Sequence, residues 1–109
     1  MTRKEADFIA ILKYKTFAES GRKTPASSGY RPQVKFEFTE MQTSGQQTFI
    51  DKEIVLPGET VEAEIKLLSP RFFINSLTVG MEFEFREGAR VMGTGKIQRI
   101  LNEELRKIS

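Results

Sequence analysis

The sequence predicts an all-β protein, folded as a small antiparallel β-barrel. Three observations support this fold class: short runs alternate apolar and polar residues, turn signals recur about every 8–12 residues, and no strand–helix unit repeats. The chain has 109 residues, the length of one domain, and its nine phenylalanines suit a packed barrel interior.

The first two expected strands flank a long loop. Residues 8–12 form a continuous apolar run, and the alternation continues to Lys15. Such a run is typical of a strand that is buried on both sides or that closes a barrel seam. After the loop, residues 34–38 alternate apolar and charged side chains, which predicts a half-buried strand.

The middle of the chain predicts a hairpin and a further strand. Residues 39–48 are polar and contain Ser-Gly-Gln-Gln, so we expect them to form the turn region of a hairpin. Apolar character returns before Pro57 and Gly58, and a proline followed by a glycine suits a type II turn. Residues 61–67 then alternate strictly, which predicts a strand with one face in water.

The last part of the chain predicts two strands and a helical tail. Residues 80–88 alternate strictly, and residues 89–97 continue with Gly93 and Gly95 on one strand face. Two glycines on one face indicate a close backbone approach or a sharp bend of the barrel. Residues 100–108 space their apolar side chains at helical intervals, so we expect a short C-terminal helical tail that caps the barrel or recruits a partner.

Residues 21–33 form the most distinctive stretch, Gly-Arg-Lys-Thr-Pro-Ala-Ser-Ser-Gly-Tyr-Arg-Pro-Gln. Its glycines permit positive φ angles, and its prolines fix φ and withhold a donor. The stretch is therefore expected to be a shaped loop that feeds a strand.

This loop resembles the long first loop of the third, C-terminal domain of bacterial elongation factor Tu, which reads Gly-Gly-Arg-His-Thr-Pro-Phe-Phe-x-Gly-Tyr-Arg-Pro-Gln. Residues 56–61 resemble the family's Met-Pro-Gly-Asp-Asn-Val, and residues 86–95 resemble its Arg-Glu-Gly-Gly-Arg-Thr-Val-Gly-Ala-Gly. The resemblance covers residues 1–101 and leaves 102–109 as an extra tail. It implies a closed barrel of about six strands, here expected to act as a stand-alone domain.

The resemblance also implies a site for structured RNA, because in the full factor this domain holds the T-arm side of aminoacyl-tRNA. The residues that it implies for binding tRNA-like RNA are Arg22, Lys23, Gln33, Glu87, Gly88 and Arg90. Arginine contacts to phosphate and a backbone approach at glycine suit recognition of RNA by shape. Ser69 replaces a family cation, which weakens the electrostatic attraction. In the alternative interpretation, Arg22, Arg31 and Gln33 hold the loop on the barrel.

A second candidate site lies in an apparent insertion. The spacing from Pro70 to Arg86 is longer than in the family, so extra residues fall within 71–79, which contain Phe72, Phe73 and Ile74. Either these side chains fold back on the barrel, or they form an exposed apolar patch for a partner. The second interpretation predicts a protein-interaction module that contacts a translation factor, a GTPase-domain partner or another subunit without binding RNA.

Composition excludes several kinds of chemistry. The chain has no histidine and no cysteine, so imidazole bases, thiol nucleophiles, disulfides and metal sites with nitrogen or sulfur ligands are excluded. It also lacks a P-loop and the guanine-recognition motif Asn-Lys-x-Asp. We therefore expect no cofactor, no metal, no nucleotide site and no catalysis.

Charge and hydropathy give two further expectations. Net charge is only +2, but residues 13–35 carry +5, residues 36–65 carry −6 and residues 86–109 carry +3. If the two basic segments are neighbours, they form a basic face opposite an acidic one; otherwise the surface has mixed polarity. No apolar run approaches the ~20 residues of a membrane span, so we expect a cytoplasmic protein with no membrane partner.

Overall fold

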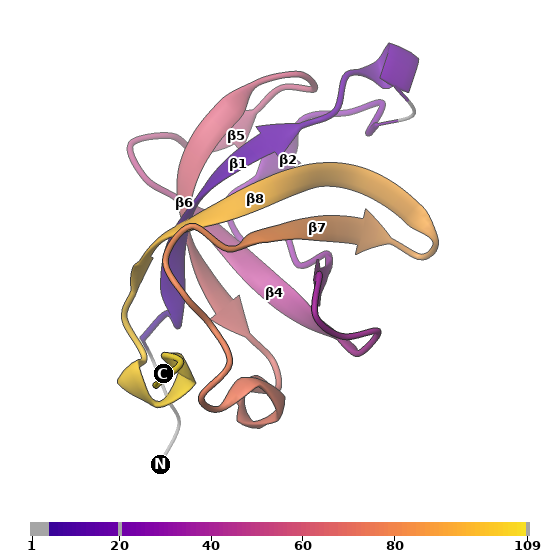
Figure 1. Ribbon diagram of the computed structural model, residues 1–109. Helices are drawn as coiled ribbons and strands as arrows, with labels where there is room; N and C mark the ends of the chain where they lie inside the picture. Colours follow the sequence, from indigo (N-terminus) through magenta and orange to yellow (C-terminus); the bar gives the residue numbers. More distant parts are fainter. Residues whose placement is uncertain (1–4, 20, 109) are drawn as a thin grey trace.

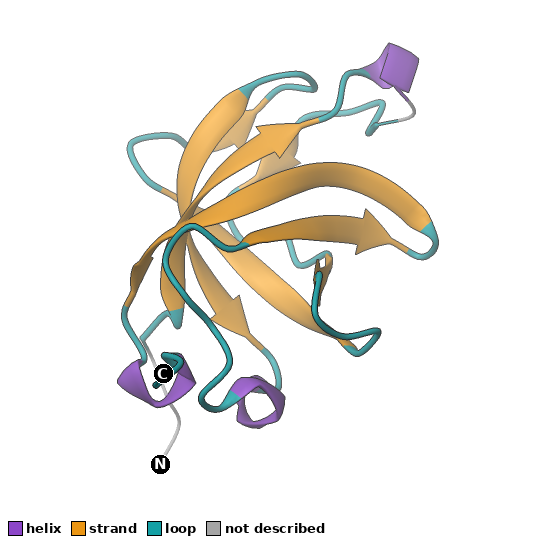
Figure 2. Ribbon diagram, viewed as in Figure 1, coloured by secondary structure: helices purple, strands orange, loops and turns teal. Residues whose placement is uncertain are grey.

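The computed structural model of the protein describes residues 5–19 and 21–108. Within these residues, six strands close into an antiparallel barrel in the order β1–β6–β4–β3–β7–β8 (Figures 1 and 2). They are β1 (Phe8–Tyr14), β3 (Gln33–Phe36), β4 (Gln42–Phe49), β6 (Thr60–Leu67), β7 (Glu82–Glu87) and β8 (Arg90–Ile100). The predicted all-β closed barrel is confirmed.

Two short strands tie the long first loop to the barrel. β2 (Ala26–Ser27) pairs antiparallel with β5 (Ile54–Val55), and the facing side chains of Ala26 and Val55 are both buried. The chain then turns at Gly58, which has a φ of 87°, and the amide of Glu59 donates to the carbonyl of Leu56 at 3.0 Å. This geometry confirms the predicted type II turn.

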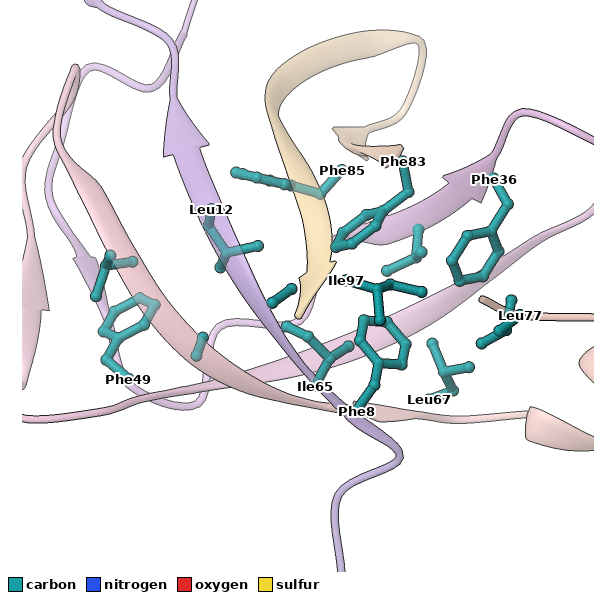
Figure 3. Close-up of a cluster of buried hydrophobic side chains, with 14 of the residues drawn as sticks. Phe8, Leu12, Phe36, Phe49, Ile65, Leu67, Leu77, Phe83, Phe85 and Ile97 are labelled. Atoms are coloured by element: carbon teal, nitrogen blue, oxygen red, sulfur yellow. The ribbon is translucent and has the colours of Figure 1, made fainter. Parts of the chain in front are cut away.

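The core consists of inward side chains from all six barrel strands, joined by Ala26, Val55, Phe73, Leu77 and Leu105 from segments outside these strands (Figure 3). The rings of Phe8, Phe36 and Phe83 meet at its centre, with centroids 5.6–6.1 Å apart in tilted and edge-to-face pairs. Gly95 and Gly93 of β8 lie directly opposite Phe83 and Phe85 of β7. Because each glycine leaves room for the facing ring, the predicted close approach at these glycines is confirmed.

The expectation of a turn at residues 39–48 is wrong, because β4 covers most of that segment. Two polar side chains of β4 point inward, and each has a hydrogen-bond partner. Gln47 accepts a hydrogen bond from the buried Tyr14 hydroxyl, and the Thr43 hydroxyl accepts one from the amide of Ser69 at 3.1 Å. A polar sequence can therefore form a barrel strand when its inward groups find partners.

The expectation of a C-terminal helical tail is also wrong. In the described part of residues 102–109, the helical structure is one 3₁₀ turn, η3 (Glu103–Leu105). The backbone instead pairs with the segment before β7: the amides of Ser76 and Leu77 donate to Leu105, and Lys107 donates to Leu77. Leu105 is thereby buried, while Ile108 is 78% exposed. Pairing with this segment outweighs the weak tendency of so short a stretch to form a helix.

Two further 3₁₀ turns complete the secondary structure of the described residues: η1 (Phe17–Glu19) and η2 (Pro70–Phe73). η1 and the β7–β8 turn lie far from η2 and η3, which are at the other end of the molecule (Figure 1). No helix among the described residues is long and apolar enough to cross a membrane.

Replacing Asp7 by alanine is expected to lower the free energy of unfolding by about 2 kcal/mol or more, because two hydrogen bonds to its buried side chain are lost. Asp7 is fully buried, and its carboxylate accepts from the amide of Leu67 at 2.7 Å and from the side-chain amide of Asn102 at 2.9 Å. Urea denaturation measures the change. Glu64→Ala, at an exposed position of β6, removes the same charge and should have little effect. Equal losses in the two variants would contradict the role given to Asp7.

Candidate functional site

The candidate site is formed by the long first loop and the β7–β8 turn. Glu87 and Arg90 are paired residues on either side of this turn, and Gly88 between them has a φ of 62°. A two-residue hairpin turn with glycine in its first position matches a type II′ turn. The turn therefore presents Glu87 and Arg90 beside the loop that carries Arg22.

Arg22 is the centre of the site. Its Nη1 donates to Glu87 at 2.6 Å, and its Nε donates to the carbonyl of Thr24 at 3.3 Å. Its Nη2 donates to the hydroxyl of Thr24 at 3.2 Å and to the carbonyl of Pro25 at 3.3 Å. One face of the guanidinium lies over the ring of Tyr30, with Cζ 4.5 Å from the ring centroid. Arg22 thus connects the loop with the β7–β8 turn.

Tyr30 and Glu87 complete this cluster. The Tyr30 hydroxyl donates to the same Glu87 oxygen that Arg22 contacts. The hydrogen bonds from Tyr30 and from Arg22 hold the pKa of Glu87 below its usual value, although partial burial acts in the opposite direction. Burial raises the pKa of the Tyr30 phenol above its usual value. At neutral pH, Glu87 is therefore an anion held by a neutral phenol and a cation.

Two further cations lie at the edge of a shallow depression. Arg90 donates to the carbonyl of Gly21 at 3.4 Å, and the Nζ of Lys23 lies 5.9 Å from the ring centroid of the exposed Phe17. The depression has a volume of about 200 Å³ and is lined by Gly21, Arg22, Lys23, Thr24, Glu87, Arg90 and Met92. Both Lys23 and Arg90 are exposed, so a negatively charged group can reach them.

The structure brings together five of the six residues that the sequence analysis implied, and it separates Gln33 from them. Arg22, Lys23, Glu87 and Arg90 line the depression, and Gly88 forms the adjacent turn. Gln33 lies on the outer face of β3 and pairs with Ser44 and Arg86 on the neighbouring strands. Any ligand that contacts Gln33 as well must extend over the outer surface of β3.

Tyr30 is part of this cluster, although the sequence analysis did not assign it to the RNA site. It stands in the Gly-Tyr-Arg-Pro-Gln motif, but nothing near it in the sequence indicates a contact with Glu87, which is 57 residues away. The available signal was an aromatic residue in a loop that also contains arginine, a pair that often stacks. That signal identifies no partner by itself.

The three apolar residues at 72–74 differ in burial: the middle one is buried and its two neighbours are exposed. Phe73 is fully buried, with its ring centroid 5.1 Å from that of Phe36. Phe72 and Ile74 are 48% and 49% exposed, and the guanidinium of Arg71 lies over the ring of Phe72. Phe73 is thus a core residue, and a contact surface at this segment would consist of Phe72 and Ile74.

The fold and the site define a class of protein: a closed antiparallel barrel that displays a polar loop cluster at one end, as binding domains commonly do. The chain belongs to the elongation factor Tu C-terminal domain family, whose model matches residues 2–101. The resemblance found in the loop motifs is therefore confirmed, and the chain is a translation-related module. Among the described residues, no group of three or more His, Cys, Asp or Glu side chains is placed to hold a metal ion.

Proposed function

We propose that this chain is a non-catalytic module that binds tRNA-like, structured RNA through the loop cluster, in a cytoplasmic setting where translation takes place. The observation that carries the proposal is the convergence of Lys23 and Arg90, which are distant in sequence, on one depression beside an exposed glycine turn. Family membership supports a role in translation.

The chemistry of the cluster suits an RNA backbone. Lys23 and Arg90 offer positive charge to phosphate oxygens, which supply most of the affinity in RNA binding that depends on shape. A Cβ at the position of Gly88 would meet no atom within 4 Å, so the turn is open to a ribose or phosphate. A-form RNA presents its phosphates and 2′-hydroxyls along a wide, shallow minor groove, which a convex turn can approach.

Reversing both charges in the double variant Lys23→Glu, Arg90→Glu is expected to weaken binding of deacylated tRNA by about tenfold or more, because two phosphate contacts become repulsive. Fluorescence anisotropy with labelled tRNA, repeated across a salt series, measures this change. Wild-type protein should show a linear fall of log K with log salt concentration.

The matched control is the double variant Lys96→Glu, Arg99→Glu, which has the same net charge. Both residues are exposed on β8, and they pair with Ile11 and Ile9 on β1, away from the loop cluster. It should bind tRNA almost as well as wild type. No binding by wild-type protein at low salt, or equal losses in the two double variants, would refute the proposed RNA site.

A contact with another protein is the second candidate function. Phe72 and Ile74 are exposed at the end of the barrel opposite the loop cluster, and exposed apolar side chains are common at protein interfaces. A translation factor or another subunit held there should remain bound at high salt, unlike RNA held by phosphate contacts. Salt dependence therefore separates the two functions.

A further inference from the structure

Arg22 is almost fully used by the protein itself. A guanidinium has five N–H groups, and four of them donate within the chain, to Glu87, to the carbonyl and the hydroxyl of Thr24, and to the carbonyl of Pro25. One face is also covered by Tyr30, and the side chain is only 22% exposed. At most one N–H, on Nη1, is left for a phosphate, and it lies next to the Glu87 carboxylate, which would repel the phosphate.

These bonds fold the loop around Arg22. Two of them reach the carbonyls of Thr24 and Pro25, so the segment from residue 22 to residue 25 curls back on the arginine side chain. Lys23 lies within this curl, and its direction depends on the backbone that Arg22 holds. Arg22 therefore acts on the exposed cation next to it in the chain.

Tyr30 in turn is fixed by the barrel. Its carbonyl accepts from the amide of Gln47 in β4 at 2.8 Å, and its ring centroid lies 6.3 Å from that of Tyr14. Tyr14 is buried, and its hydroxyl donates to the buried side chain of Gln47. The ring on which Arg22 rests, and the hydroxyl that holds Glu87, therefore belong to a residue that is anchored to the barrel core.

We propose that Tyr30 and Arg22 are the positioning residues of the RNA site, and that Lys23 and Arg90 make its phosphate contacts. Tyr30 holds Arg22 and Glu87 in place, and Arg22 closes the curl that directs Lys23 toward the depression. The benefit for binding is preorganisation: the loop is ordered before RNA arrives. This inference rests on the proposed RNA-binding function.

Two substitutions one residue apart test it, Arg22→Gln and Lys23→Gln, because each removes one positive charge. The slope of log K against log salt concentration counts phosphate contacts, at about 0.7–0.9 per contact. Lys23→Gln should reduce the slope by about that amount. Arg22→Gln should lower the affinity for tRNA while leaving the slope unchanged. A slope reduced as much by Arg22→Gln as by Lys23→Gln would overturn the inference, since Arg22 would then be a phosphate ligand.

Tyr30→Phe provides the second test, because it keeps the ring under Arg22 and removes the hydroxyl that holds Glu87. We expect affinity for tRNA to fall by about three- to tenfold with an unchanged salt slope. Amide hydrogen exchange within residues 22–28 should become faster, a change that is measured without RNA. Unchanged affinity and unchanged exchange would overturn the inference.

The two proposals fail in distinguishable ways. If wild-type protein does not bind tRNA, the proposed function fails and the positioning role fails with it. If wild-type protein binds, but Tyr30→Phe binds equally well or Arg22→Gln reduces the slope, the proposed function stands and the positioning role fails.

Discussion

Replacing Phe73 by alanine is expected to lower the free energy of unfolding by about 3–5 kcal/mol, because truncation of a buried aromatic side chain loses its burial and leaves a cavity. Phe73 is fully buried at the end of the barrel, and its ring contacts Phe36 and Phe38 edge to face at centroid distances of 5.1 and 6.3 Å. Chemical denaturation followed by circular dichroism measures the change. If the variant does not fold, Phe73→Leu, with a smaller expected loss, gives the same test.

Phe72→Ala is the matched control, since it removes the same side chain from the neighbouring position. Phe72 is 48% exposed and its contact is with Arg71 at the surface. Removing this side chain should lower the free energy of unfolding by less than about 1 kcal/mol, as is usual for surface substitutions. Equal effects of the two truncations would contradict the division of this segment into a core residue and exposed neighbours.

The strands with strict alternation could be predicted from the sequence because their inward side chains are apolar. In β6 every second residue is buried, and in β7 the alternating Phe83 and Phe85 are buried, as the hydrophobic pattern requires. β4 could not be predicted in this way. Its inward residues include Thr43 and Gln47, and the groups that satisfy them, Ser69 and Tyr14, come from distant parts of the chain. Local pattern carries no information on such partners.

At residues 102–108 the local pattern predicted a helix that the structure does not contain. Its apolar spacing fits a helix, but the strong constraint is the buried Asp7, which accepts hydrogen bonds from the amides of Leu101 and Asn102 and from the side chain of Asn102. These bonds direct the chain across the barrel end and leave Leu105 to fill the core. Tertiary contacts thus override the local helical pattern.

The grouping of the candidate site residues was expected from the resemblance, but their contacts were not, and their binding of RNA stays a prediction. The motifs on the loop and on the β7–β8 turn brought Arg22 and Glu87 together by resemblance, although 65 residues separate them in the chain. The role of Arg22 was left open between an RNA contact and a structural contact. Its hydrogen bonds in the folded protein show how many N–H groups remain for a ligand. The Tyr30 ring beneath the guanidinium belongs to the same motif, but the motif alone does not indicate this contact.

Introducing a side chain at Gly95 is expected to destabilise the barrel strongly, because a Cβ there would lie too close to the Phe83 ring. The Cβ of Gly95→Val would overlap the ring of Phe83 on β7, and that ring has no room to move because it packs against Phe8 and Phe36 with centroids 5.6 Å away in each case. We expect the free energy of unfolding to fall by about 3 kcal/mol, the upper part of the range for overpacked cores. Thr94→Val, at the exposed adjacent position, introduces the same residue and should change stability by less than about 0.5 kcal/mol.

A double-mutant cycle tests the cause of this loss. The three atoms nearest to the built Cβ of Gly95 all belong to the Phe83 ring, so shortening that side chain should relieve the clash. In a Phe83→Leu background, the cost of Gly95→Val is expected to fall by about 1–3 kcal/mol, the range found for residues in direct contact. Urea denaturation of the four proteins measures the coupling. Additive losses would mean that Gly95 is required by the bend of β8 itself, and that the room it leaves for Phe83 is a consequence of that bend.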